Sequence, residues 1–220
     1  HSIERPALAA TRFPLGELTK PEVRALARGA GLAVHDKPDS TGICFIGERP
    51  FREFLAGWLQ ERPGPIEAPD GRVLGEHRGV AFYTLGQRGG LEIGGRAGFA
   101  EAPWYVAAKD AARNALIVVQ GHDHPLLLST GLETGPAQWL CDPPDRPFDC
   151  QAKVRYRQPD QAARVEPLED GRLRVRFERP QRAVTPGQSC VLYSGERCLG
   201  GAVIDTLLPV AAAHGAGVAA

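Results

Sequence analysis

Apolar residues follow a helical spacing near the start of the chain, in residues 18–32 (LTKPEVRALARGAGL). The positions that share one face of this helix are Val23, Leu26, Ala27 and Ala30. Thr19 is followed three residues later by Glu22, which is the pairing of a capping box. Pro21 suits the first turn, where its missing N–H costs little. The pattern therefore predicts an amphipathic helix that begins just after Thr19.

A second helical spacing follows in residues 50–59 (PFREFLAGWL). The apolar positions on its shared face are Phe51, Phe54, Leu55, Trp58 and Leu59. The run RPGP at residues 62–65 ends the pattern, because proline cannot continue a helix. We expect a second short helix here, with this face buried.

The pattern then changes to short strands and turns. Strand-like runs occupy residues 79–87 (GVAFYTLGQ), 103–110 (PWYVAAKD) and 114–121 (NALIVVQG). From about Leu126 onward the chain is predicted to be strand and turn throughout.

Alternation is clearest in this last part of the chain. The runs VRYRQ (154–158) and RLRVRFE (172–178) alternate, and Asp170-Gly171 is a strong hairpin turn. Residues 189–205 (SCVLYSGERCLGGAVID) predict one more hairpin, around Gly195. The 26 glycines and 19 prolines agree with many short elements rather than long helices.

Charge adds one local signal to a neutral chain, which has 26 basic and 26 acidic residues. Residues 151–182 hold nine Lys or Arg against five Asp or Glu, a net charge of +4. Arg155 and Arg157 share one strand face with Tyr156 on the other, and the next strand presents Arg172, Arg174 and Arg176. Rows of guanidinium groups beside an aromatic ring suit an RNA backbone with a stacked base. The alternative is an ordinary solvated outer face of the sheet.

Composition also bounds the cellular setting. No apolar run reaches the roughly 18 residues of a membrane span, and the first residues lack the basic-then-apolar layout of a signal peptide. Five cysteines without framework spacing favour a reducing cytoplasm over a disulfide scaffold. The chain contains no Met and begins with His1, so we expect a fragment of a longer protein or a processed chain.

Cys44 is the cysteine with the most informative surroundings, PDSTGICFIG (residues 38–47). In an extended chain it is a good small core residue, because free cysteine is among the most buried residue types. The alternative is a thiolate, with Lys37, Arg49 and a following helix nearby, although the residues alone favour the core role. They do not exclude either reading.

Other candidate sites are weaker. His122 and His124 in GHDH could share a face, but this pair alone is a poor metal signal. The glycine-rich run at residues 86–95 lacks a phosphate-binding fingerprint and is predicted to be a flexible hairpin tip. We therefore expect no metal site in this chain.

Seven runs occur together and in one order: FPLGELTKPEVRALA, DSTGICFIGERPFREFL, YTLGQRGGLEIGG, PWYVAAKD, GHDHPLL, VRYRQ and VTPGQSCVLYSGERCLGG. With these runs the chain resembles the bacterial-type tRNA-specific 2-thiouridylases, from His1 to about Asp205. The resemblance implies a tRNA-uridine 2-sulfurtransferase, which thiolates the wobble uridine. It also implies two partners, tRNA and a sulfur donor protein (a persulfide carrier or a cysteine desulfurase), and no membrane.

By this resemblance, Cys44 receives the persulfide sulfur. ATP, with Mg, adenylates the C2 oxygen of the uridine. The persulfide sulfur, or sulfide released from it, attacks C2, AMP leaves, and a second cysteine forms a disulfide with the first. The family's tRNA contacts carry over to Arg155 and Tyr156 of VRYRQ and to Gln188 of TPGQS.

The chain also departs from the family. The family's S-G-G-x-D-S loop for ATP does not occur in it, and the partner cysteine lies with that loop. The ATP site is therefore expected outside this chain, and the chain alone is expected to be inactive. None of the other four cysteines is assigned the partner's role.

The resemblance also orders the fold, which is predicted to be mainly β with an α/β N-terminal remnant. Residues 1–47 are expected to end the catalytic α/β domain, and 48–124 to form a small central β-rich domain. Residues 125–208 are expected to form a C-terminal antiparallel β-barrel, and 209–220 a disordered tail. Two alternatives remain: a non-catalytic RNA-binding β-barrel module, and a purely structural fragment.

Overall fold

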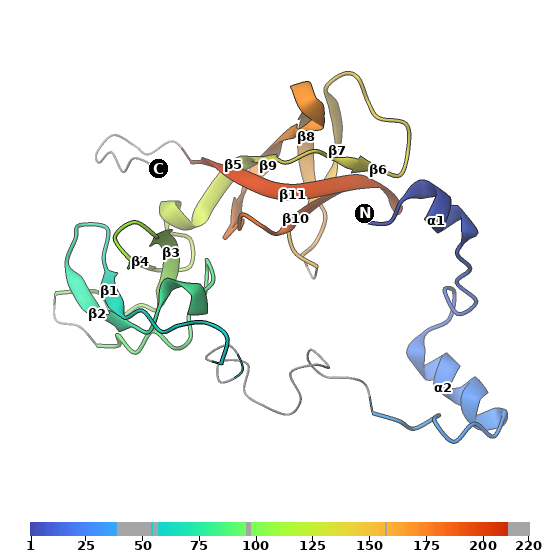
Figure 1. Ribbon diagram of the computed structural model, residues 1–220, viewed down its shortest axis with the longest axis horizontal. Helices are drawn as coiled ribbons and strands as arrows, with labels where there is room; N and C mark the ends of the chain where they lie inside the picture. The colour runs from blue at the N-terminus through green and yellow to red at the C-terminus, as the bar shows by residue number, and fades with distance from the viewer. Residues whose placement is uncertain (39–53, 55–56, 96–97, 157, 211–220) are drawn as a thin grey trace. The chain divides into compact units, whose positions relative to one another are not determined.

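A computed structural model describes residues 1–38, 54, 57–95, 98–156 and 158–210 (Figure 1). The chain divides into two units, His1–Arg5 with Leu59–Ala220, and Pro6–Trp58. Each unit is described by itself below. Among the described residues, no helix combines the length and the apolar character that crossing a membrane requires.

Two helices lie near the start of the chain, α1 (Arg5–Ala10) and α2 (Lys20–Gly29). The predicted capping box of α2 is confirmed: the backbone N–H of Thr19 donates to the Glu22 carboxylate at 2.7 Å. The Thr19 side chain and backbone, which both hydrogen-bond to this carboxylate, lower the pKa of Glu22. The predicted apolar face of α2 is not buried against the described part of the chain, and Leu26 is 60% exposed. Most of the second predicted helix, like the tail from 211 onward, lies outside the described residues.

The central part of the chain forms a four-stranded sheet with the order β2-β1-β4-β3. Its strands are β1 (Gly64–Glu67), β2 (Val73–His77), β3 (Trp104–Asp110) and β4 (Ala115–Gln120). Strands β1 and β4 pair in parallel, and the other neighbours pair antiparallel. The core on this sheet includes Ile66, Val106, Leu116 and Val118. The strands predicted at 103–110 and 114–121 are thus confirmed.

The strand predicted at residues 79–87 is wrong. The segment holds a short 3-10 helix, η1 (Val80–Phe82), and then a turn. Gly79 and Gly86 both have positive φ, +148° and +78°, which an extended strand does not contain. The next residues do not form the predicted flexible hairpin tip, because Leu91 and Ile93 are buried in the central core.

The C-terminal part closes into a six-stranded antiparallel barrel. Its ring runs β10-β7-β8-β9-β5-β11, and β11 pairs back with β10. The short β6 adds to β11. The elements are η2 (Pro125–Leu127), β5 (Leu128–Thr134), β6 (Gln138–Trp139), β7 (Phe148–Lys153), β8 (Gln161–Pro167), η3 (Glu169–Gly171), β9 (Leu173–Arg182), β10 (Ser189–Ser194) and β11 (Arg197–Pro209). The predicted fold class, mainly β with a C-terminal antiparallel barrel, is confirmed.

The alternation in residues 172–178 does place one face inside the barrel. Leu173, Val175 and Phe177 of β9 are buried in the barrel core. The turn before them, Asp170-Gly171, has φ of +63° and +79°, as a tight hairpin turn requires. Local sequence therefore decided both the turn and the inward face of this strand.

The predicted strand at residues 154–158 is wrong, because β7 ends at Lys153. The chain turns there: the backbone N–H of Gln158 donates to the carbonyl of Arg155 at 3.2 Å. The Gln158 side-chain oxygen also accepts from the backbone N–H of Val154 at 3.3 Å. A glutamine that bonds backward in this way satisfies locally the groups that a strand partner would otherwise satisfy.

Candidate functional site

The barrel brings Arg155, Tyr156 and Gln188 to one place. Arg155 and Tyr156 follow the last residue of β7, and Gln188 precedes the first residue of β10. These strands pair antiparallel, with Lys153 opposite Val191. The end of one strand therefore lies beside the start of the other, although the residues are far apart in the sequence.

Two hollows border this cluster, of about 350 and 320 Å³. Arg155, Tyr156 and Gln188 line both of them. The first is also lined by Lys153, Val154, Ser189, Val191 and Tyr193 of the barrel. The second is also lined by Thr84, Leu85, Gly86, Gln87 and Thr185. Sequence reasoning missed residues 84–87, which it assigned to a strand; the glycine of TLGQ was the signal of a turn.

Tyr156 presents its ring to solvent, and its exposed fraction is 94%. The side chain therefore does not belong to the barrel core. A large aromatic ring beside a hollow is suited to stack on an unpaired base, which has a flat face whatever its identity.

Arg155 is held partly by the protein itself. Its Nη2 donates to the carbonyl of Ala183 at 3.0 Å and to the carbonyl of Leu85 at 3.3 Å. The residue as a whole is exposed. Because a guanidinium carries five N–H donors in a planar fork, these two contacts leave further donors for an anion.

One more cation borders the first hollow. The Lys153 ammonium lies 5.2 Å from the centre of the Tyr193 ring and 3.1 Å from a carboxylate oxygen of Asp160. The charge of half-buried Lys153 is therefore offset by the Asp160 carboxylate, and its ammonium group packs against the Tyr193 ring in the wall of the hollow.

Two of the three arginines in the predicted row, Arg172 just before β9 and Arg174 within it, are paired with acids. Arg174 contacts Glu133 at 2.8 Å and Glu166 at 3.3 Å, and Arg172 contacts Asp170 at 3.2 Å. The hydrogen bond to Glu133 is the largest influence that raises the pKa of Arg174. These pairs favour the solvated outer face over a phosphate-binding row for Arg172 and Arg174.

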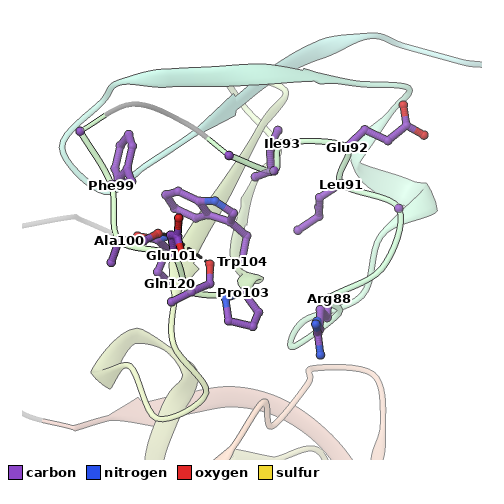
Figure 2. A pocket seen from close by; sticks show the side chains of 15 residues that line it. Arg88, Leu91, Glu92, Ile93, Phe99, Ala100, Glu101, Pro103, Trp104 and Gln120 are labelled. Carbon is purple, nitrogen blue, oxygen red and sulfur yellow. Dashed lines mark hydrogen bonds between the residues drawn. The ribbon is translucent and has the colours of Figure 1, made fainter.

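A third hollow, of about 720 Å³, lies in the central domain. Figure 2 shows the Trp104 indole between Phe99 and Ile93, and the Phe99 and Trp104 ring centres are 5.0 Å apart. Two carboxylates, Glu92 and Glu101, and one guanidinium, Arg88, also line it. Because the acids outnumber the base, the hollow offers no net positive charge to a phosphate backbone, so it is not part of the candidate RNA surface.

The histidines of GHDH serve local structure. His124 Nδ1 accepts from the backbone N–H of Leu126 at 3.2 Å and caps η2. Burial lowers the pKa of His124. His122 contacts the adjacent Asp123 carboxylate at 2.8 Å. Within the part of the chain that the structure describes, no three His, Cys, Asp or Glu side chains are placed to hold a metal ion.

Comparison with known proteins gives three matches along the chain. A tRNA methyl transferase HUP domain matches residues 1–48, and a tRNA methyl transferase PRC-barrel domain matches 52–120. An aminomethyltransferase beta-barrel domain matches 129–204. The candidate cluster lies within this last match, except for the 84–87 turn.

Similar full-length proteins carry one name. The tRNA-specific 2-thiouridylase MnmA of Marinobacter nauticus is 56% identical over 206 residues, which are 93% of this chain and 52% of that protein. The proteins of the same name from Xanthomonas axonopodis pv. citri and Halorhodospira halophila are each 57% identical, over 205 and 208 residues. These matches cover 93% and 94% of this chain, and 54% of each relative. The chain belongs to the tRNA-specific 2-thiouridylase family. It spans about half the length of the curated relatives it matches.

The described residues hold neither the persulfide cysteine nor, at the start of α2, a site for a phosphate. Cys44, to which the resemblance assigns the persulfide, lies outside them. A phosphate does not fit the N-terminus of α2, because the capping carboxylate of Glu22 already occupies it and would repel the phosphate.

The four cysteines that the structure describes are free thiols: Cys141, Cys150, Cys190 and Cys198. Burial raises the pKa of Cys150 to about 11 and that of Cys190 to about 12. Because the thiolate is the nucleophile in sulfur chemistry, these two barrel cysteines are poor candidates for sulfur transfer.

The raised pKa values of these two thiols predict slow alkylation of the folded chain. In the folded chain at pH 8, roughly one Cys150 in a thousand is a thiolate, so iodoacetamide should leave Cys150 and Cys190 largely unmodified. Peptide mass spectrometry after alkylation measures this, and alkylation in denaturant is the control that should modify both. Rapid labelling of Cys190 in the folded chain would contradict the burial of its thiol.

Proposed function

We propose that this chain is the sulfur-carrying and RNA-binding half of a tRNA-specific 2-thiouridylase, which converts the wobble uridine of tRNA to 2-thiouridine. The name of the relatives described above, tRNA-specific 2-thiouridylase, supports this reaction. Because these relatives are about twice as long as the matched region, we place the use of ATP, with Mg, in the other half of the enzyme. Cys44 carries the persulfide sulfur in this proposal. A persulfide carrier or a cysteine desulfurase delivers that sulfur in the cytoplasm.

The observation that carries the RNA-binding part is the convergence of three residues at one end of the barrel. Arg155, Tyr156 and Gln188 come from two separate loops and border the same two hollows. A stacking ring, a guanidinium and an amide are the groups that recognise an unpaired base, a phosphate and a base edge. Arg174 of β9 and the preceding Arg172, by contrast, are paired with acids.

Each residue then makes its own contact with the RNA. Tyr156 stacks on an unpaired base, and Arg155 places its outward N–H donors on a phosphate. Gln188 donates or accepts a hydrogen bond at a base or ribose edge. Because phosphate contacts position RNA without reading its sequence, the choice among tRNAs rests on the base contacts and on tRNA shape.

Filter binding of the 220-residue chain to a tRNA transcript, at several salt concentrations, tests this proposal. Arg155→Ala should weaken binding and make the log–log salt slope shallower by about 0.7 to 0.9, as expected when one phosphate contact is lost. The loss should be similar for transcripts with and without a wobble uridine.

Arg164→Ala is the matched control, because Arg164 is an exposed barrel arginine paired with Asp149 at 3.0 Å. It should leave the slope unchanged. Absence of tRNA binding by the folded wild-type chain would favour a purely structural fragment. Binding by the chain would favour a non-catalytic RNA-binding module if no 2-thiouridine forms when the chain is joined to the N-terminal half of its Marinobacter nauticus relative.

A further inference from the structure

Two arginines of the barrel contact a single turn of the central domain. Residues 84–87 form this turn, in which the backbone N–H of Gln87 donates to the carbonyl of Thr84 at 3.0 Å. Gly86 occupies its third position with a φ of +78°, which favours glycine. Gly86 also donates its N–H to the carbonyl of Val106 in β3 at 2.8 Å, so the turn is fixed to the central sheet.

Arg155 and Arg182 bind the carbonyl groups of this turn. Arg155 Nη2 connects the carbonyl of Leu85 with that of Ala183 in the barrel, at 3.3 and 3.0 Å. Arg182 Nη2 lies 3.5 Å from the carbonyl oxygen of Gly86.

Arg182 makes two further contacts, one with the central sheet and one with the segment that follows it. Its Nε donates to the carbonyl of His122 at 2.9 Å. Its guanidinium lies 4.7 Å from the centre of the Tyr105 ring in β3, a cation–π distance. A single barrel side chain therefore contacts three separate points along the chain before the barrel.

The backbone of the 84–87 turn also closely approaches the Ala183 side chain of the barrel. A Cβ added to Gly86 would lie 2.5 Å from the Cβ of Ala183, closer than two non-bonded carbon atoms can approach. Ala183 is buried and has a φ of +50°, uncommon for a residue with a side chain. Only glycine fits at position 86 while Ala183 keeps this place.

We propose that Gly86, Arg155, Arg182 and Ala183 form a clasp that fixes the 84–87 turn against the barrel and thereby shapes the second hollow. This inference rests on the proposed function, because the hollow has the turn as one wall and Tyr156 and Gln188 on the other. Arg182 is then a positioning residue: it contacts protein carbonyls, and it holds the surface that the RNA contacts. Arginine suits this task better than lysine because its planar fork reaches several carbonyls at once.

Arg182→Ala tests the clasp in two ways. Hydrogen exchange of the RNA-free chain should rise in peptides that contain residues 84–87, since the arginine contacts that hold this turn to the barrel are lost. Filter binding to a tRNA transcript should weaken about tenfold, because charge-assisted contacts are lost. The salt slope should stay as in the wild type, because Arg182 contacts no phosphate. A slope shallower by about 0.7 to 0.9 would overturn the positioning role and make Arg182 a phosphate contact.

Gly86→Ala tests the close approach, and it has a matched control and a rescue. Gly71→Ala adds a side chain at a similar φ, +85°, where nothing lies within 4 Å, so it carries the backbone strain without the clash. Gly86→Ala should weaken tRNA binding more than Gly71→Ala does. Adding Ala183→Gly to Gly86→Ala should restore most of that difference, because it removes the clashing Cβ and relieves the positive φ at residue 183.

Circular dichroism melting shows whether each variant is folded. If Gly86→Ala alone does not fold, the double variant Gly86→Ala with Ala183→Gly tests the contact. No recovery in the double variant would overturn the proposed contact between the two residues. If the folded wild-type chain does not bind tRNA, the proposed function fails on its own. Hydrogen exchange then decides the clasp: increased exchange at residues 84–87 in Arg182→Ala supports it, and unchanged exchange overturns it.

Discussion

Cys44→Ser is expected to abolish 2-thiouridine formation from a persulfide donor in an enzyme that joins this chain to the N-terminal half of its Marinobacter nauticus relative. A serine hydroxyl cannot accept and carry a sulfane sulfur, whereas a thiolate can. Digestion of the tRNA and mass spectrometry of the nucleosides measure the product. Binding of tRNA should persist, because Arg155, Tyr156 and Gln188 are unchanged.

Two controls make this result specific. Cys198→Ser should retain activity, because the proposal gives this barrel thiol no part in sulfur transfer. The 220-residue chain alone should form no 2-thiouridine with ATP, since the S-G-G-x-D-S run is not in it. Free sulfide could partly bypass the cysteine, so the donor must be a persulfide. Full activity of Cys44→Ser under these conditions would move the sulfur to another cysteine.

Tyr156→Ala is expected to weaken tRNA binding by about 1–3 kcal/mol, which is the usual contribution of one aromatic ring stacked on one base. The salt slope should change little, because the ring neutralises no phosphate. The melting temperature should also stay close to that of the wild type, because the side chain is 94% exposed and leaves no cavity in the barrel.

Tyr156→Phe is the matched control, since it keeps the ring and removes only the hydroxyl. If stacking carries the contact, this variant should bind tRNA almost as the wild type does. An equal loss in both variants would assign the contact to the hydroxyl group. A lower melting temperature of Tyr156→Ala with unchanged affinity would show that the ring supports the fold and does not bind RNA.

Where neighbouring residues supply both partners of an interaction, the sequence was sufficient. The start of α2 follows from Thr19 and Glu22, because a capping box is closed within four residues. The turn Asp170-Gly171 follows from two residues that tolerate positive φ, and the alternation after it predicted the buried face of β9. Arg155, Tyr156 and Gln188 were also named from the sequence, through the resemblance of their runs to a family.

The geometry of the candidate site required the tertiary structure. Residues 154–158 alternate as a strand does, yet no alternation reveals that β7 ends at Lys153 and that the chain then turns. Antiparallel pairing of β7 with β10 placed Gln188 beside Tyr156, and strand register is a property of the whole barrel. The acids that pair with Arg174, and the carbonyls that hold Arg155 and Arg182, come from segments distant in sequence. The sequence by itself determined which chemical groups the chain carries and how its short segments fold; the tertiary structure decided which of those groups meet, because charge compensation and hydrogen bonding depend on distance in space.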